Sequence, residues 1–212
     1  MKTTLPRNGR AAIGLTAMLF CSTGHATITV IDYYRLGDAD AGAVNGATVN
    51  AASQDSVGTK HLTRIGSPAY TNAVSIDAAA RAGSQLAVSF NGSGQGLSNG
   101  MVSTVTDNFG IEAWARPYTA SGSHSIAYNG NIGLSGWGLY QSGANYVALL
   151  GGVSFVGSAP ITLNGWTHVA LVRASGMATL YVNGVAAGGR GRWSEAARRC
   201  RALSAPTYRF GV

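Results

Sequence analysis

The sequence predicts an all-β protein, an antiparallel two-sheet sandwich of the jelly-roll type. Three observations predict it: segments in which apolar and polar residues alternate, repeated Asn-Gly dipeptides typical of tight hairpin turns, and almost no helical periodicity between residues 27 and 189. The composition agrees, since the chain holds 30 Gly and only 11% charged residues, whereas globular domains average about 25%. Low charge with 46% hydrophobic residues also excludes an intrinsically disordered chain.

Residues 1–26 are expected to be a secretory signal peptide. Three basic residues precede an apolar run from Ala11 to Cys21, and small residues lead up to Ala26. The apolar run is shorter than the roughly 20 residues that a membrane span needs. We therefore expect cleavage after Ala26 and a mature chain without a membrane span. Its expected location is secreted, periplasmic or on the cell surface.

The net charge of +7 comes from the two ends of the chain. Residues 27–189 carry six basic and seven acidic side chains, whereas residues 190–212 carry six arginines and one glutamate. Binding to the phosphates of a nucleic acid needs basic residues gathered on a structured face. We therefore expect no nucleic-acid partner.

The first expected elements are a short helix and a strand. The segment SIDAAARAG predicts the helix, with Asp77 as its N-cap and Gly83 at its end. The strand LAVSF follows, and its alternation places Leu86, Val88 and Phe90 on one face.

The clearest strand is NFGIEAWARP, which starts at residue 108. Alternation places four apolar residues on one face and three others on the opposite face, namely Phe109, Ile111, Ala113 and Ala115 against Glu112, Trp114 and Arg116. Pro117 ends the strand because proline has no N–H for the ladder. The segments WGLYQSGANYVALLGG and GGVSFVGSAPITL predict further strands interrupted by glycine.

A hairpin is expected near the end of the middle region. The runs Thr167–Arg173 and Ala178–Val182 flank a Ser175-Gly176 turn, and Asn183-Gly184 provides a further turn of type I′. Many short strands at this spacing indicate a sandwich of two sheets.

The strand GIEAWARP and the hairpin GWTHVALVR…LYVNG resemble the laminin G-like branch of the concanavalin A-like jelly rolls. YYRLGD, residues 33–38, resembles the first strand of that family, and LAVSFNGSG resembles the strand after its variable loops. The resemblance covers most of residues 29–188 and implies a laminin G-like domain over residues 27–189.

The tail, residues 190–212, departs from that family. Its members usually add two more strands after the hairpin, but here only TYRFG, from Thr207 to Gly211, is a candidate, as the penultimate strand. We expect an incomplete sandwich, from a truncated or frame-shifted chain. The alternative is a short surface helix with one side formed by Ala196, Ala197, Cys200 and Leu203. Cys200 is the only cysteine after the signal, so no internal disulfide is expected.

Catalytic residues are not expected. Glycosidases need two carboxylates across the scissile bond, and Glu112 is the only glutamate between residues 27 and 189. We interpret Glu112 as structural. The string GLSNG from Gly96 to Gly100 matches the nucleophile elbow GxSxG, but no helix is expected after it. The histidines His61, His124 and His168 lack the spacing of a zinc site, and His168 is expected to be a packed or half-exposed strand residue.

Calcium is the one cofactor that the resemblance suggests, because laminin G-like folds sometimes bind it through loop oxygens. Asp38 and Asp40 are the nearest pair of acids, and Asp107 is a further loop acid. We interpret all three as solvated turn residues, so no metal ligand is assigned.

Aromatic residues are the remaining candidates for sugar binding, although in a sandwich most of them fill the core. Five are available: Trp114, Trp137, Tyr140, Tyr146 and Trp166. Trp137 and Tyr140 differ by three positions, so on a regular strand they face opposite sides. The sequence does not say which one faces outward.

We expect an exported, non-catalytic binding or adhesion module whose partner is an extracellular glycan or protein. No ligand-binding residue is singled out. Two alternatives stay open. One is a carbohydrate-active enzyme or its accessory domain, which would need a second carboxylate near Glu112; the other is an incomplete, non-functional fragment.

Overall fold

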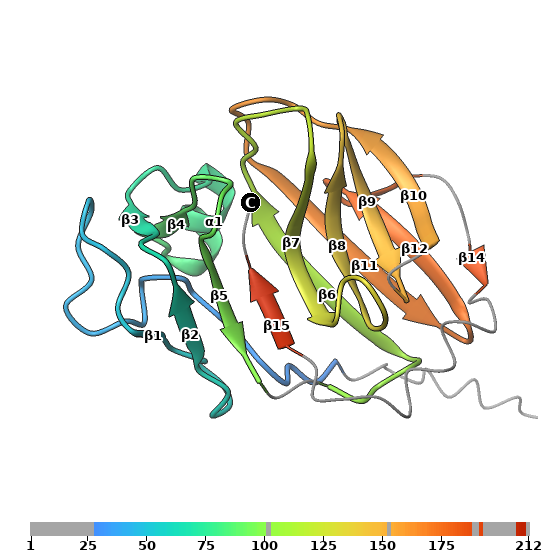
Figure 1. The fold of residues 1–212 in the computed structure, drawn as a ribbon, viewed down its shortest axis with the longest axis horizontal. Helices are drawn as coiled ribbons and strands as arrows, with labels where there is room; N and C mark the ends of the chain where they lie inside the picture. Colours follow the sequence, from blue (N-terminus) through green and yellow to red (C-terminus); the bar gives the residue numbers. More distant parts are fainter. Residues whose placement is uncertain (1–27, 101–102, 152–153, 188–190, 193–206, 211–212) are drawn as a thin grey trace, which may run out of the picture.

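Two antiparallel sheets packed face to face form the body of the protein (Figure 1). The computed structural model describes residues 28–100, 103–151, 154–187, 191–192 and 207–210. The predicted fold class, an all-β sandwich, is confirmed. No helix among these residues is long and apolar enough to cross a membrane.

The larger sheet has eight strands, in the order β1 (Ala52–Ser53), β2 (Leu62–Ile65), β5 (Gly96–Asn99), β15 (Thr207–Phe210), β7 (Ser123–Gly130), β8 (Trp137–Ser142), β9 (Asn145–Leu150) and β10 (Ser154–Pro160). The five-stranded sheet has the order β13 (Val185–Ala186), β12 (Met177–Val182), β11 (Thr167–Ala174) and β6 (Phe109–Ala115), and β14 (Gly191–Arg192) also pairs with β12. A separate two-stranded ribbon joins β3 (Ala69–Thr71) and β4 (Ala87–Ser89). The helix α1 spans Ile76–Ala82.

The main hydrophobic core lies between the two sheets. It contains the inward side chains of both layers, including Leu139, Leu150, Leu171 and Leu180, all at most 1% exposed. The apolar face of β6 packs against it as predicted, and the Phe109 ring stacks on the buried Trp137 ring with centroids 4.0 Å apart. A second core gathers Val49, Leu62, Tyr70 and Leu97 beside the ribbon.

The predicted hairpin is confirmed. Ser175 and Gly176 both have positive φ, 51° and 77°, between β11 and β12. Asn183 and Gly184, at 48° and 78°, make the next turn, which leads to β13. The Asn183 side chain also accepts a hydrogen bond from the His168 N–H at 3.0 Å. Paired positive φ angles are typical of the type I′ turn, which the sequence predicted for Asn183-Gly184.

The N-cap of the helix lies two residues earlier than predicted. Ser75, not Asp77, is the N-cap: its backbone is extended and its hydroxyl accepts from the Ala78 N–H. Asp77 lies in the first turn, where its negative charge interacts favourably with the helix dipole. Gly83 ends the helix in the left-handed conformation, as predicted.

The segment YYRLGD is not a strand. Only Tyr34 forms an isolated bridge, to Asp55. Leu36 and Gly37 then adopt positive φ angles of 48° and 129°, which turn the chain. The Asp38 carboxylate fixes this turn, because its Oδ1 accepts from the N–H groups of Gln85 and Leu86 at 2.9 Å.

The tail contributes an interior strand to the larger sheet. β15 pairs with β5 on one side and with β7 on the other. The prediction of a strand at TYRFG is confirmed. The expectation that the sandwich lacks one further strand, because the chain is truncated or frame-shifted, stays a prediction. The alternative surface helix over residues 196–203 lies outside the described residues.

Candidate functional site

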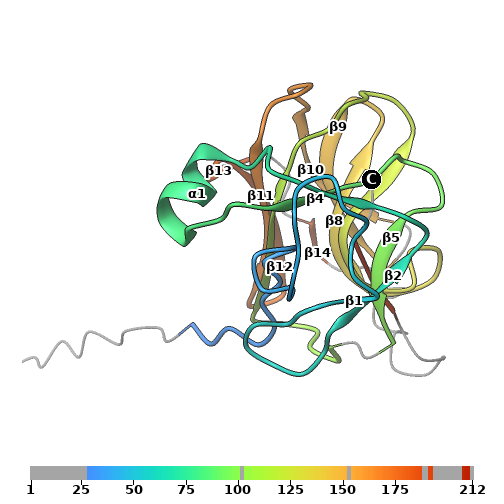
Figure 2. The same cartoon turned by 90° about the vertical axis from the view of Figure 1, so that its left-hand side faces the viewer.

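The outer face of β6 carries the polar side of the predicted strand. Because alternate residues of β6 enter the core, Glu112 and Trp114 point away from it, and Arg116 continues this face just beyond the strand. β6 is the last strand in the order of the five-stranded sheet. Figure 2 shows α1 on this outer side, away from the eight-stranded sheet.

A groove with a volume of about 440 Å³ lies between this face and the segment that leads into α1. Such a volume is within the usual range for ligand pockets, about 300–1,000 Å³. The groove is lined by Ala73, Val74, Ser75, Ile76, Asp77, Trp114, Arg116, Asn164 and Trp166. It therefore combines two indole rings with one cation, one carboxylate and one amide.

Hydrogen bonds fix the walls of the groove. The Trp166 indole Nε1 donates to the Ala73 carbonyl at 3.1 Å, which ties the start of β11 to the segment before α1. The Arg116 Nε donates to the Asn164 carbonyl at 2.9 Å, and its guanidinium lies 5.5 Å from the centre of the Tyr118 ring. Two of the large side chains are thus held before any ligand arrives.

Trp114 links the groove to a polar pair on the same face. Its ring lies 5.3 Å from the His168 ring, tilted by 55°. The His168 Nε2 is 3.3 Å from the Glu112 Oε2. Glu112 is an exposed side chain at 75%, so this pair lies at the solvent surface and not in the core.

The acids considered as calcium ligands hold loops through hydrogen bonds. Asp40 Oδ2 accepts from the Tyr70 hydroxyl at 2.9 Å, and its Oδ1 accepts from the Gln54 N–H at 2.7 Å. Asp107 accepts from the Gly176 N–H with both oxygens and lies 3.3 Å from the Arg173 Nε. Within the part of the chain that the structure describes, no three His, Cys, Asp or Glu residues gather as a metal site would require.

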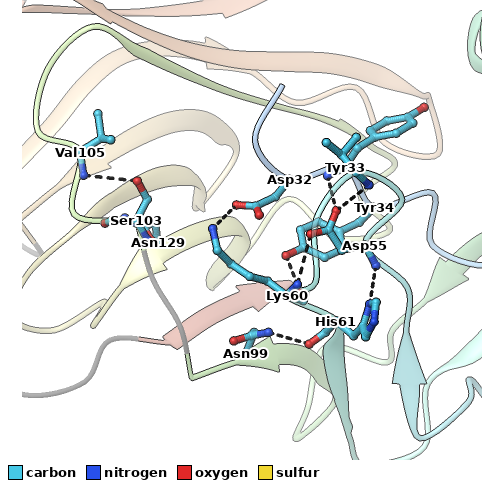
Figure 3. Close-up of polar contacts among 11 residues, drawn as sticks. Asp32, Tyr33, Tyr34, Asp55, Lys60, His61, Asn99, Ser103, Val105 and Asn129 are labelled. Atoms are coloured by element: carbon cyan, nitrogen blue, oxygen red, sulfur yellow. Dashed lines mark hydrogen bonds and ion pairs between the residues drawn. The ribbon is translucent and has the colours of Figure 1, made fainter. Parts of the chain in front are cut away.

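A second polar cluster surrounds Asp55 (Figure 3). Its carboxylate accepts from the N–H groups of Tyr33, Val57 and Lys60 at 3.0–3.3 Å. Burial raises the pKa of the Asp55 carboxyl, but backbone N–H donors, Gly58 included, outweigh this and leave the pKa below its ordinary value. This cluster orders the chain before β2.

Side chains around Asp55 extend this cluster. The Lys60 ammonium pairs with Asp32 at 3.0 Å, and the His61 Nδ1 accepts from the Asp55 N–H at 3.1 Å. Figure 3 also shows Asn129. Its side chain accepts a hydrogen bond from the Ser103 N–H and donates one to the Ser103 carbonyl. The contacts of Asn129 and His61 are with backbone groups, whereas Lys60 and Asp32 pair through their side chains. All of them hold segments of the chain together.

The three histidines that were considered as zinc ligands do not lie together in one site. His61 contacts Asp55, His124 Nε2 lies 3.2 Å from the Ser121 carbonyl, and His168 pairs with Glu112. The GxSxG string is not an elbow either. Gly96–Asn99 is the strand β5, in which Ser98 pairs with Thr63 of β2.

The five candidate aromatic residues lie in three places, namely the core, the groove and the outer face of β8. Trp137 and Tyr146 are core residues, exposed by 6% and 0%. Trp114 and Trp166 line the groove, and Tyr140 lies on the outer face of β8. Trp137 and Tyr140 therefore face opposite sides as predicted, with Trp137 inside. The sequence offered no local signal for the groove, because Trp166 and Ala73 are 93 positions apart.

The fold and the groove define the class: a jelly-roll sandwich with an aromatic groove on one outer face. A laminin G family model described as concanavalin A-like lectin/glucanases superfamily matches residues 90–198, and the chain belongs to this family. The resemblance drawn from the strand and hairpin motifs is thereby confirmed.

Comparison with solved structures finds domain 4 of AbnA, a GH43 extracellular arabinanase from Geobacillus stearothermophilus, solved in complex with arabinotriose. The two are 17% identical, with a TM-score of 0.44 over 69% of this chain and 67% of that chain. No curated protein matches the sequence.

Proposed function

We propose that this protein is an exported glycan-binding module that acts without catalysis of its own. The observation that carries the proposal is the groove, in which Trp114 and Trp166 stand beside Arg116, Asn164 and Asp77. The face of an indole ring is electronegative, and the C–H groups on the face of a sugar ring pack well against it. Membership of the concanavalin A-like family supports a binding role.

The polar residues of the groove suit the hydroxyl groups of a sugar. Arg116 offers N–H donors in a fixed orientation, because its Nε is already bound to the Asn164 carbonyl. Asp77 offers acceptors, and the Asn164 side chain can offer both. A hydroxyl that leaves water for this groove can therefore regain its hydrogen bonds, which an apolar wall alone would not provide.

The same groove lacks the pair of acids that glycoside hydrolysis needs. Of the described residues that line it, Asp77 is the only carboxylate. Glu112 is exposed on the neighbouring surface and paired with His168. Because retaining and inverting glycosidases both use two carboxylates, this arrangement supports binding rather than cleavage.

Export rests on the sequence of residues 1–26, which lie outside the described residues. Their basic start, short apolar run and small residues before position 27 support removal as a secretory signal. A glycan ligand outside the cytoplasm agrees with this location.

Binding to polysaccharides tests the proposal. Wild type and the variants Trp114→Ala and Trp166→Ala are compared on a panel of neutral and acidic polysaccharides by affinity electrophoresis. Loss of a stacking ring from the groove should weaken binding about tenfold or more, as removal of a central aromatic anchor does. Circular dichroism confirms that each variant is folded.

Tyr33→Ala is the matched control, because Tyr33 is an aromatic side chain that is 42% exposed and does not line the groove. It should bind as the wild type does. Retention of full affinity by both tryptophan variants, or failure of every polysaccharide to bind, contradicts the proposal.

A further inference from the structure

The outer face of the eight-stranded sheet carries a second aromatic surface, on the other layer from the groove. Leu139 of β8 and Val156 of β10 point into the core, so their neighbours Tyr140 and Phe155 point outward. The two rings are nearly parallel, with an interplanar angle of 24° and centroids 6.2 Å apart. Phe155 is 55% exposed, which is unusual for a side chain of this size.

The two rings meet above β9, the strand between their own. Val147 pairs with Tyr140 and Leu149 with Phe155, so all four side chains share the outer face. Val147 and Leu149 are nevertheless only 5% and 4% exposed. We call Tyr140 and Phe155, with this aliphatic base, the aromatic platform.

The platform lies in a part of the chain that carries no formal charge. Residues 117–172 contain no Asp, Glu, Lys or Arg, and this stretch includes all of β7 to β10. Beside the platform, Ser142 and Asn145 form the next pair of outward positions. The strands β7 to β10 thus offer ring faces, a hydroxyl and an amide on this surface, and none of their own side chains is an ionic partner for a charged ligand.

We propose that the aromatic platform is a second glycan-binding surface, selective for uncharged polysaccharides. An acidic polymer would give up hydration of its carboxylates here without gaining a cation from β7 to β10, and this loss of hydration is costly. A neutral sugar can place its C–H face on the rings and its hydroxyls on the polar fringe. The inference rests on observations separate from those of the groove.

A protein partner fits this surface less well. Phe155 is the only large apolar side chain of β7 to β10 that is exposed among the described residues, whereas a stable protein interface buries about 800 Å² on each side. Strand addition at the outer edge of β10 is also hindered, because the Ser158 N–H of this strand already donates to the Ala187 carbonyl at 2.9 Å. The register of β10 shifts between Val156 and Ala159, and Pro160 ends the strand; bulges and prolines protect sheet edges.

The test uses the Trp114→Ala variant as background, so that the platform is measured with the groove impaired. Hydroxyethylcellulose and carboxymethylcellulose serve as neutral and acidic probes on the same type of polymer backbone. Binding is measured by affinity electrophoresis at low and high salt. The background protein should bind the neutral probe with an affinity that salt changes less than twofold, and the acidic probe at least fivefold more weakly.

Adding Phe155→Ala or Tyr140→Ala should weaken binding to the neutral probe at least fivefold. Leu134→Ala, at a residue 72% exposed in the loop between β7 and β8, is the matched control and should have no effect. If the background protein binds the neutral probe with the same affinity whether or not it carries Phe155→Ala, the proposal is overturned. Tighter binding of the background protein to the acidic probe than to the neutral probe also overturns it. A concentration-dependent dimer in sedimentation that Phe155→Ala abolishes would assign the platform to a second copy instead.

Failure of the groove and of the platform are distinguishable in this design. If Trp114→Ala in the wild-type protein has no effect while Phe155→Ala does, the groove proposal fails and the platform stands. The opposite pattern retains the groove alone.

Discussion

Tyr70 shows how single polar groups hold the part of the chain that precedes the sandwich. Its side chain is 1% exposed, and its hydroxyl donates to Asp40 Oδ2 at 2.9 Å. The oxygen of the Tyr70 hydroxyl also accepts from the Asn50 N–H at 3.0 Å. One hydroxyl therefore satisfies a buried carboxylate and a backbone donor from two different segments.

Tyr70→Phe is predicted to lower the free energy of unfolding by about 1–3 kcal/mol, because Asp40 and the Asn50 N–H lose a partner in a buried place. Urea denaturation monitored by circular dichroism measures this change in the free energy of unfolding. Tyr118→Phe, at a residue 58% exposed, is the control and should change stability little. An unchanged midpoint for Tyr70→Phe would show that water replaces the hydroxyl without loss.

The same variant has a consequence at high pH. Burial, with smaller contributions from Asp40, raises the pKa of Tyr70 to about 12, above the ordinary value of 10.0. A raised pKa in the folded state means that this stabilisation is complete below pH 10 and is lost as the pH rises from 10 to 12. Tyr70→Phe should therefore show a shallower fall in stability over this interval than the wild type does.

At the scale of elements, β15 joins two parts of the larger sheet. Without it, β1, β2 and β5 have no ladder to β7, β8, β9 and β10. Arg209 occupies the central register position, opposite Ser98 of β5 and Tyr128 of β7. The backbone of this residue is thus in the interior of the sheet.

Arg209→Pro is predicted to lower the melting temperature by roughly 5–10 °C, because proline removes the N–H and proline is confined to edges in sheets. Arg209→Ala is the matched control, since it keeps the backbone donor and should melt within a few degrees of wild type. Differential scanning calorimetry distinguishes the two. Equal melting temperatures for both variants would mean that β15 does not stabilise the sheet.

Strands with strong local patterns could be predicted from the sequence. β6, β11 and β12 alternate regularly, and Asn183-Gly184 specifies its turn by itself. β7 was not predicted, because its register shifts between Ser125 and Ala127 and this irregularity interrupts the alternation. YYRLGD contains strand-forming residues, but the contacts of Asp38 with distant backbone turn the chain.

The candidate sites depend on contacts that no local pattern contains. Alternation placed Trp114 and Arg116 on one face, but the opposite wall of the groove comes from the segment before α1. Likewise, the spacing of Trp137 and Tyr140 predicts opposite faces without choosing between them. Trp137 is the inner residue because its Nε1 donates a hydrogen bond to the Val105 carbonyl at 3.0 Å and its ring stacks on the Phe109 ring.

At the scale of the whole molecule, the two proposed surfaces belong to different layers. The groove borders the outer face of the five-stranded sheet, and the aromatic platform lies on the outer face of the eight-stranded sheet. Because the outer faces of a sandwich point in opposite directions, one glycan chain cannot easily occupy both. Two sites that face apart favour contacts with two separate polysaccharide chains.

This geometry predicts that the protein cross-links a neutral polysaccharide. Light scattering from a mixture with hydroxyethylcellulose should rise with wild type, since each molecule can join two chains. Trp114→Ala and Phe155→Ala each leave one surface, so either variant should still bind the polymer in affinity electrophoresis while the scattering falls to that of the polymer alone. The double variant should not bind. If single variants scatter as strongly as wild type, one of the two surfaces does not take part, and a single site with self-association would explain the cross-linking better.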